Sequence, residues 1–140
     1  MAVAFTLVAA PARSAPPAPI GAWWTEDKGG VIRISPCGDE LCGRIVGQDE
    51  PRTVTGDVPR TPQGTPHCGL MILRVSAAAD GHWRGSITDP DDGTVWRCDL
   101  VVDGQGALRL RGYVLTPLFG ATQVWPPFEG HLSQACDILP

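Results

Sequence analysis

Three histidines are the first residues to examine for chemistry. His67, His82 and His131 lie far apart in the chain, in a loop, at the start of a strand and in the tail, and no motif joins them. An imidazole can serve as a general base because its pKa lies near neutrality. Histidines in turns, however, usually make local hydrogen bonds. His67 adjoins Cys68, and a neighbouring cation can activate a thiol, but adjacent residues of an extended chain point to opposite sides. We therefore expect no catalytic residues.

The serines and acidic residues give no second route to catalysis. The chain has no Gly-x-Ser-x-Gly motif, which positions the nucleophile in many hydrolases. Asp89, Asp91 and Asp92 crowd one turn that ends at Gly93, but a calcium loop needs more widely spaced oxygens and a distal Glu. The spacing favours an Asx turn. We expect a protein that is not an enzyme, with no metal and no cofactor.

Arginines alternate with apolar residues along several of the expected strands. They could bind a carboxylate, because a guanidinium group offers two parallel hydrogen bonds. Most should face outward, but one or two that turn inward would anchor a ligand. The polar ligand-binding candidates are Arg44, Arg111 and Tyr113.

Short strands must position these residues, and hydrophobic alternation predicts about eight of them. Turns rich in Gly, Pro and Asp separate the expected strands. They cover residues 21–25, 31–36, 41–46, 69–76, 82–88, 94–102, 107–114 and 119–125. The pattern predicts an all-β fold, a single small up-and-down antiparallel β-barrel. Gly21 should allow a tight bend at its start, and Trp23 should turn its ring inward as a plug.

The interior of this barrel should be apolar and aromatic. The inward-facing candidates, which we take as the ligand-binding residues, are Trp23, Trp83, Trp96, Ile34, Ile72, Leu100 and Leu110. An eight-stranded barrel lies at the boundary between a filled interior and one that holds a small ligand. Gly43, Gly85 and Gly112 fall at inward positions, where a missing side chain either makes room for the tryptophans or leaves a cavity.

The N-terminal segment 1–18 is typical of a signal peptide or leader, and 19–140 would form the barrel domain with a C-terminal tail. Ala2 to Ala10 form an apolar run, and Ala10-Pro11-Ala12 offers a cleavage site. Because no Lys or Arg precedes the run, the true start could lie within a longer signal, or the segment could be an anchor. About nine apolar residues are too few to span a bilayer, which needs about 20. We expect a periplasmic or secreted protein with no transmembrane span after leader removal.

Cysteine usage agrees with export, because five cysteines in a small exported chain suggest disulfides. Cys37 and Cys42 flank four residues that could form a hairpin loop, which predicts a bond between them. Cys136 could be tied back to the body through Cys98 or Cys68. The disulfide candidates are Cys37, Cys42, Cys98 and Cys136. Because the number of cysteines is odd, one thiol must remain free. No clustered Cys or His spacing favours zinc.

An ordered set of short motifs resembles the DUF2147 family of exported bacterial proteins. The motifs are Gly21-Ala22-Trp23, Ile34-Ser35-Pro36-Cys37-Gly38, Leu41-Cys42-Gly43-Arg44-Ile45-Val46, Cys68-Gly69-Leu70, Asp89-Pro90-Asp91-Asp92-Gly93, Arg111-Gly112-Tyr113 and Thr122-Gln123-Val124-Trp125. The resemblance implies a lipocalin-like barrel. In such barrels a basic residue after the last strand stacks on the first-strand Trp, but here Pro126 and Pro127 follow Trp125, so that Arg109 or Arg111 would have to substitute.

Two functions fit these expectations. The first is a non-enzymatic exported binding protein that holds a small apolar or amphiphilic ligand in its barrel. The alternative is a cell-envelope protein-interaction module with a filled core, which uses the Pro-rich loop 48–67 as its contact surface. The net charge of −4 gives no support for a nucleic-acid partner, which would favour a basic domain. The sequence leaves the oligomeric state and the identity of the ligand open.

Overall fold

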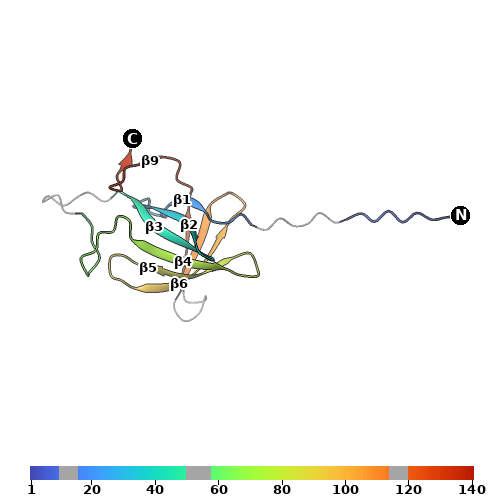
Figure 1. Ribbon diagram of the computed structural model, residues 1–140, viewed down its shortest axis with the longest axis horizontal. Helices are drawn as coiled ribbons and strands as arrows, with labels where there is room; N and C mark the ends of the chain where they lie inside the picture. Colours follow the sequence, from blue (N-terminus) through green and yellow to red (C-terminus); the bar gives the residue numbers. More distant parts are fainter. Residues whose placement is uncertain (10–15, 50–57, 114–119) are drawn as a thin grey trace.

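Eight strands follow one another and pair antiparallel with their neighbours in the computed structural model, which describes residues 1–9, 16–49, 58–113 and 120–140. They are β1 (Gly21–Trp24), β2 (Gly30–Cys37), β3 (Glu40–Gln48), β4 (Met71–Ala77), β5 (Trp83–Thr88), β6 (Val95–Val102), β7 (Leu108–Tyr113) and β8 (Gly120–Trp125). The sheet curls strongly into a half-barrel (Figure 1). The prediction of an all-β, up-and-down antiparallel fold is confirmed.

The edge strand β1 bonds to the chain segment that follows β8. The Trp24 amide donates to the Pro126 carbonyl at 2.8 Å, and the Phe128 amide donates to the Ala22 carbonyl at 2.9 Å. Proline has no N–H but keeps its carbonyl, so Pro126 can accept this bond. The Phe128 ring packs edge-on against Trp24, with ring centroids 5.0 Å apart. An aromatic residue thus lies against β1 at the join.

The two arginines that could have stacked on the first-strand tryptophan make other contacts. Arg109 donates through Nε to Asp103 at 3.2 Å, and Arg111 donates through Nη1 to the Thr122 hydroxyl at 3.0 Å. Both lie on β7, on the face opposite its buried residues Leu108 and Leu110. Strand alternation accounts for this outward orientation.

The inner face of the sheet carries the core. Apolar side chains from the strands turn inward, and burying one Leu or Ile stabilises the fold by about 1.5–3 kcal/mol. Trp23 is only 7% exposed and donates its Nε1–H to the Pro19 carbonyl at 3.0 Å, so its predicted inward orientation is confirmed. The buried cluster comprises Trp23, Ile32, Ile34, Leu41, Ile45, Ile72, Leu73, Val75, Cys98, Leu100, Val102, Leu108, Leu110 and Trp125.

The Cys37–Cys42 disulfide lies across the β2–β3 hairpin. Their Cα atoms are 5.8 Å apart, and the predicted bond is present. Strand pairing continues up to Cys37 and Glu40, so the turn is shorter than the four-residue loop expected. Cys42 itself pairs with Ser35. The disulfide is therefore diagonal to the strand pairing.

The second disulfide corrects the prediction that included Cys98. It joins Cys68 to Cys136, whereas Cys98 is a free thiol. The Cys98 side chain points into the core from β6 and is completely buried, while Cys68 lies in the outer loop before β4. Burial raises the pKa of the Cys98 thiol to about 12, which keeps it protonated at neutral pH.

A short C-terminal hairpin of β9 (His131–Leu132) and β10 (Ile138–Leu139) lies beside the end of β3 (Figure 1). The Gln48 amide donates to the Cys136 carbonyl at 2.9 Å. The tail and the loop before β4 are therefore both fastened to the body through Cys136.

Residues 1–9, from the expected leader, are exposed and carry no secondary structure. Within the described ranges, no helix has the length and hydropathy needed to cross a membrane.

Candidate functional site

A cavity of about 660 Å³ opens at one end of the sheet. In an up-and-down sheet, the β1–β2, β3–β4 and β5–β6 connections lie at the same end, and residues from all three line this cavity. Its lining is Thr25, Glu26, Asp27, Gly29, Gly30, Ile32, Ile45, Gly47, Gln48, His67, Ile72, Ile87, Thr88, Asp89, Pro90, Asp91, Trp96, Leu110, Gly112, Ala121, Gln123 and Trp125. We refer to this end as the mouth.

The walls of the cavity are apolar. Five aliphatic side chains from five different strands line it: Ile32, Ile45, Ile72, Ile87 and Leu110. The indoles of Trp96 and Trp125 complete the wall, and Trp125 donates its Nε1–H to the Gln123 side-chain oxygen at 2.8 Å. Such walls suit an alkyl or aromatic group.

Gly112 contributes to the size of the cavity. It lies opposite Cys98 in the β6–β7 register, at an inward position. A Cβ built there would meet only Trp96 Cβ at 3.9 Å and the Arg97 carbonyl at 4.0 Å. The missing side chain therefore leaves open space. This agrees with the interpretation that an inward glycine leaves a cavity.

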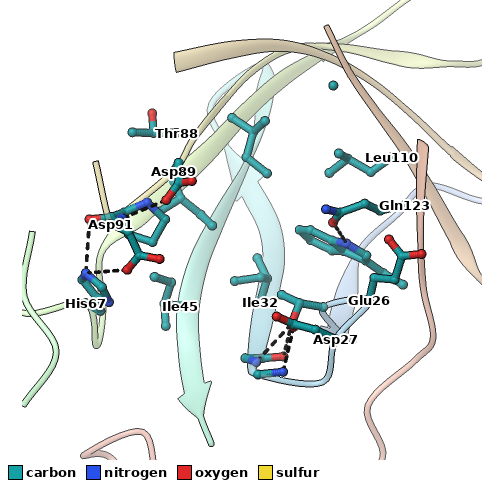
Figure 2. A pocket seen from close by; sticks show the side chains of 18 of the residues that line it. Glu26, Asp27, Ile32, Ile45, His67, Thr88, Asp89, Asp91, Leu110 and Gln123 are labelled. Atoms are coloured by element: carbon teal, nitrogen blue, oxygen red, sulfur yellow. Dashed lines mark hydrogen bonds and ion pairs between the residues drawn. The ribbon is translucent and has the colours of Figure 1, made fainter. Parts of the chain in front are cut away.

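Carboxylates line the mouth on two sides (Figure 2). Glu26 and Asp27 come from the β1–β2 turn, and Asp89 and Asp91 come from the β5–β6 turn. Figure 2 shows the two pairs facing the cavity from opposite sides, with Ile32 and Ile45 between them. Among the described residues that line the cavity there is no Lys or Arg.

Two of these carboxylates shape their own turns. Asp27 Oδ1 accepts hydrogen bonds from the Gly29 amide at 2.9 Å and the Thr25 hydroxyl at 2.7 Å. These bonds, that of Gly29 first, lower the pKa of Asp27. Asp89 Oδ1 accepts from the Asp91 amide at 2.8 Å. The Asx turn predicted for this segment is confirmed.

His67 fixes the β3–β4 loop against the β5–β6 turn. Its side chain is buried, at 4% exposed, and Nε2–H donates to the Pro90 carbonyl at 3.2 Å. The same nitrogen lies 3.9 Å from an Asp91 carboxylate oxygen, and the His67 amide donates to the Pro59 carbonyl at 2.9 Å. His67 therefore has the local bonding role expected from the sequence, and it also lines the cavity.

The sequence candidates divide between the cavity and other parts of the sheet. Ile72, Leu110 and Trp96 line the cavity, and Trp96 stays 36% exposed at the mouth. The remaining apolar candidates lie in or against the core without being part of the lining: Trp23, Trp83, Ile34 and Leu100.

The polar candidates do not line the cavity. Arg44 is exposed and donates to the Gly69 carbonyl at 3.1 Å. Arg111 faces Thr122 on β8, and Tyr113 lies opposite Gly120 at the end of β7. The expectation of an inward guanidinium group is thus corrected for Arg44, because alternation places it on the outer face of β3.

Sequence reasoning missed most of the lining, including seven residues with polar or aromatic side chains. They are Trp125, Gln123, His67, Glu26, Asp27, Asp89 and Asp91. Two signals could have found most of them. Alternation places Gln123 and Trp125 on one face of β8, and alternate turns of a meander share one end of the sheet.

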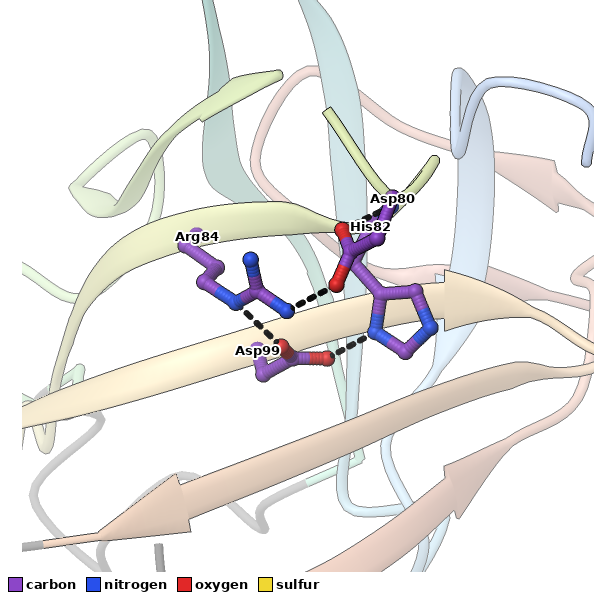
Figure 3. A network of polar contacts seen from close by, with 4 residues as sticks. All are labelled: Asp80, His82, Arg84 and Asp99. Atoms are coloured by element: carbon purple, nitrogen blue, oxygen red, sulfur yellow. Dashed lines mark hydrogen bonds and ion pairs between the residues drawn. The ribbon is translucent and has the colours of Figure 1, made fainter. Parts of the chain in front are cut away.

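A separate polar network lies on the outer face, at the end of the sheet away from the mouth (Figure 3). Asp99 accepts from His82 Nδ1 at 2.6 Å and from Arg84 Nε at 2.7 Å. Arg84 also pairs with Asp80, whose other oxygen accepts from the His82 amide at 3.1 Å. A carboxylate that orients an imidazole resembles part of an acid–base pair. Here the same carboxylate also holds Arg84, so the network ties the β4–β5 turn to β6.

No group of three His, Cys, Asp or Glu side chains in the described residues lies close enough to hold a metal ion. The mouth carboxylates are instead spread around its rim.

Comparisons with known proteins agree with this architecture. Residues 21–126 match a family described as "Uncharacterized protein conserved in bacteria (DUF2147)". Among solved structures, the chain is similar to one titled "Protein HP1028 from the human pathogen Helicobacter pylori belongs to the lipocalin family". The TM-score is 0.62 at 11% identity, over 83% of this chain and 84% of that one, a likeness of fold. No protein of curated function matches the chain. With most of its length matched, the chain belongs to the DUF2147 family and has a lipocalin-like fold.

Proposed function

We propose that this protein is an exported, non-enzymatic binding protein that holds a small apolar or amphiphilic molecule in the mouth cavity. The cavity carries the proposal. Its volume of about 660 Å³ falls within the roughly 300–1,000 Å³ of small-molecule sites. Apolar walls below a polar rim suit a molecule with an apolar body and a polar end.

Export is supported by three observations. The apolar run at residues 2–10 precedes a family match that begins at Gly21. Two disulfides form in the structure, and such bonds persist in oxidising compartments. The leader 1–18 would be removed before the domain folds.

The residues that could perform chemistry have other roles. His67 is bound to the Pro90 carbonyl, and the raised pKa of Cys98 leaves it a poor nucleophile. Binding therefore explains the cavity better than catalysis. An open cavity also favours ligand binding over an interaction module with a filled core. The contact loop of that alternative, 48–67, includes residues 50–57, which lie outside the described residues.

A titration tests the proposal. A neutral fluorescent probe, N-phenyl-1-naphthylamine, is added to the mature protein, and 1-decanol is then used to displace it. We expect saturable probe binding with displacement, together with a change in tryptophan fluorescence, because Trp96 and Trp125 line the cavity. A flat response to the probe and to a panel of neutral and charged amphiphiles would contradict the proposal.

Gly112→Leu provides the matched variant. The new side chain would occupy open space beside Trp96, so we expect probe affinity to fall at least tenfold while the fold is kept. Gly104→Leu is the control, because Gly104 lies in the β6–β7 turn and a Cβ there would have no neighbouring atom within 4 Å. Equal probe affinity in both variants would place the binding outside the cavity.

A further inference from the structure

We propose that the cavity selects amphiphiles with a cationic head group, such as an amine or a quaternary ammonium, over amphiphiles with a carboxylate. This inference rests on the proposed function and specifies the chemistry of its ligand. The apolar chain would lie between the aliphatic walls, and the head group would lie at the mouth. Carboxylates alone do not make a binding site, but here they rim a hollow of about 660 Å³.

The charge at the rim of the cavity is mainly negative. The described parts of the three mouth loops carry acidic residues in excess of basic ones. The acidic side chains are Glu26, Asp27, Asp49, Asp89, Asp91 and Asp92, and the basic ones are Lys28 and Arg60. Arg60 donates to the Gly64 carbonyl within its own loop, and neither basic residue lines the cavity.

The carboxylates of the outer face and those of the mouth have different bonding partners. On the outer face, carboxylates pair with cations: Asp99 and Asp80 with Arg84, Asp103 with Arg109, and Glu40 with Arg74. At the mouth, Asp27 and Asp89 instead accept from hydroxyl and backbone amide donors.

Neutral donors leave the charges of Asp27 and Asp89 uncompensated. Asp27 accepts from a hydroxyl and a backbone amide, and Asp89 accepts from a backbone amide. These bonds stabilise the ionised carboxylate without cancelling its charge. A cationic head group would supply the missing positive charge.

The mouth carboxylates lie on two sides of the cavity (Figure 2). Glu26 and Asp27 face the cavity from one side and Asp89 and Asp91 from the other (Figure 2), so a head group between them would be attracted from both. Trp96 also lies at the mouth, next to the β5–β6 turn, and is partly exposed. An indole face attracts ammonium groups. A fatty acid, in contrast, would place its carboxylate among like charges.

The test compares three amphiphiles of equal chain length on the mature protein: decyltrimethylammonium, 1-decanol and decanoate. Each is titrated below its micelle concentration against the bound naphthylamine probe. We expect the ammonium to bind at least tenfold more tightly than decanoate at 0.1 M salt. The ratio should shrink at 1 M salt, because the screening length falls from about 10 Å to about 3 Å.

Variants of the mouth carboxylates test whether these residues cause the preference for the ammonium over decanoate. Glu26→Gln and Asp91→Asn, alone and combined, should lower the ratio of the ammonium affinity to the decanoate affinity. Asp39→Asn is the control, because Asp39 is an exposed carboxylate in the β2–β3 turn at the other end of the sheet. Thermal unfolding of each variant checks that the fold is kept.

The outcomes separate this inference from the proposed function. If decanol and decanoate bind as tightly as the ammonium, the selectivity is wrong while ligand binding stands. If the preference persists in the double variant, the mouth carboxylates do not cause it. If no amphiphile binds, both proposals fail.

Discussion

At the scale of single residues, aspartates that close turns are a recurring feature. Asp89 and Asp92 accept from the amides of Asp91 and Thr94, two residues on. The sequence predicts such turns because an Asp side chain readily bonds the backbone two residues later. It does not predict that the turn carrying Asp89 lies beside the cavity, since this depends on how tightly the sheet curls.

These bonds make the protein sensitive to acid. Backbone or side-chain donors lower the pKa of four aspartates below the usual 3.8: Asp27, Asp80, Asp92 and Asp103. The unfolded chain would take up protons on these groups at a higher pH than the folded one. The stabilisation is therefore complete above about pH 5 and is lost as the pH falls through and below 3.8.

We expect the free energy of unfolding in urea to fall steadily from pH 5 to pH 2.5. Asp103→Asn should flatten this fall, because Asn keeps the acceptor for the Ala107 amide but does not titrate. A free energy of unfolding that is constant or rises over this range would contradict the assignment.

At the scale of the strands, Gly85 shows where two neighbours approach closely. A Cβ at this position on β5 would lie 2.0 Å from the Arg74 carbonyl oxygen of β4. The backbone, rather than a flexible side chain, is the obstacle. Gly112, which the sequence places in the same class of inward glycines, has open space instead. Alternation identifies both as inward but cannot distinguish a tight contact from a hollow.

Gly85→Ala should therefore lower the free energy of unfolding by about 1–3 kcal/mol or more, as overpacking does. Gly112→Ala should change it by less than about 1 kcal/mol, because the added methyl group makes ordinary contacts. Urea unfolding of the two variants side by side measures both values. Equal losses would contradict the close approach of β4 and β5.

The two disulfides constrain segments of very different length. Cys37 and Cys42 are five residues apart, whereas Cys68 and Cys136 are 68 apart. In the chain-entropy model, the longer loop stabilises by about 4 kcal/mol and the shorter by about 2 kcal/mol. Replacing Cys68 and Cys136 by Ser should thus cost more in urea unfolding than replacing Cys37 and Cys42. The reverse order would show that the tail is held by other contacts.

At the scale of the whole molecule, alternation and turn residues predict the order and direction of the eight strands. Alternation and turn residues are both properties of short stretches of sequence, which explains why the strands could be predicted from them. The cavity depends on the curl of the sheet and on which turns converge at its mouth. Arg44 illustrates the limit, since a basic residue suited to anchoring a ligand lies on the outer face. The fold was therefore more predictable than the site.

The proposed binding mode places an alkyl chain in the cavity. Intermolecular nuclear Overhauser effects between decyltrimethylammonium and methyl-labelled protein test it most directly. We expect contacts from the alkyl-chain protons to the methyl groups of Ile32, Ile72 and Leu110. Contacts to the exposed Val124 and Leu139 instead, or none at a saturating concentration, would contradict it.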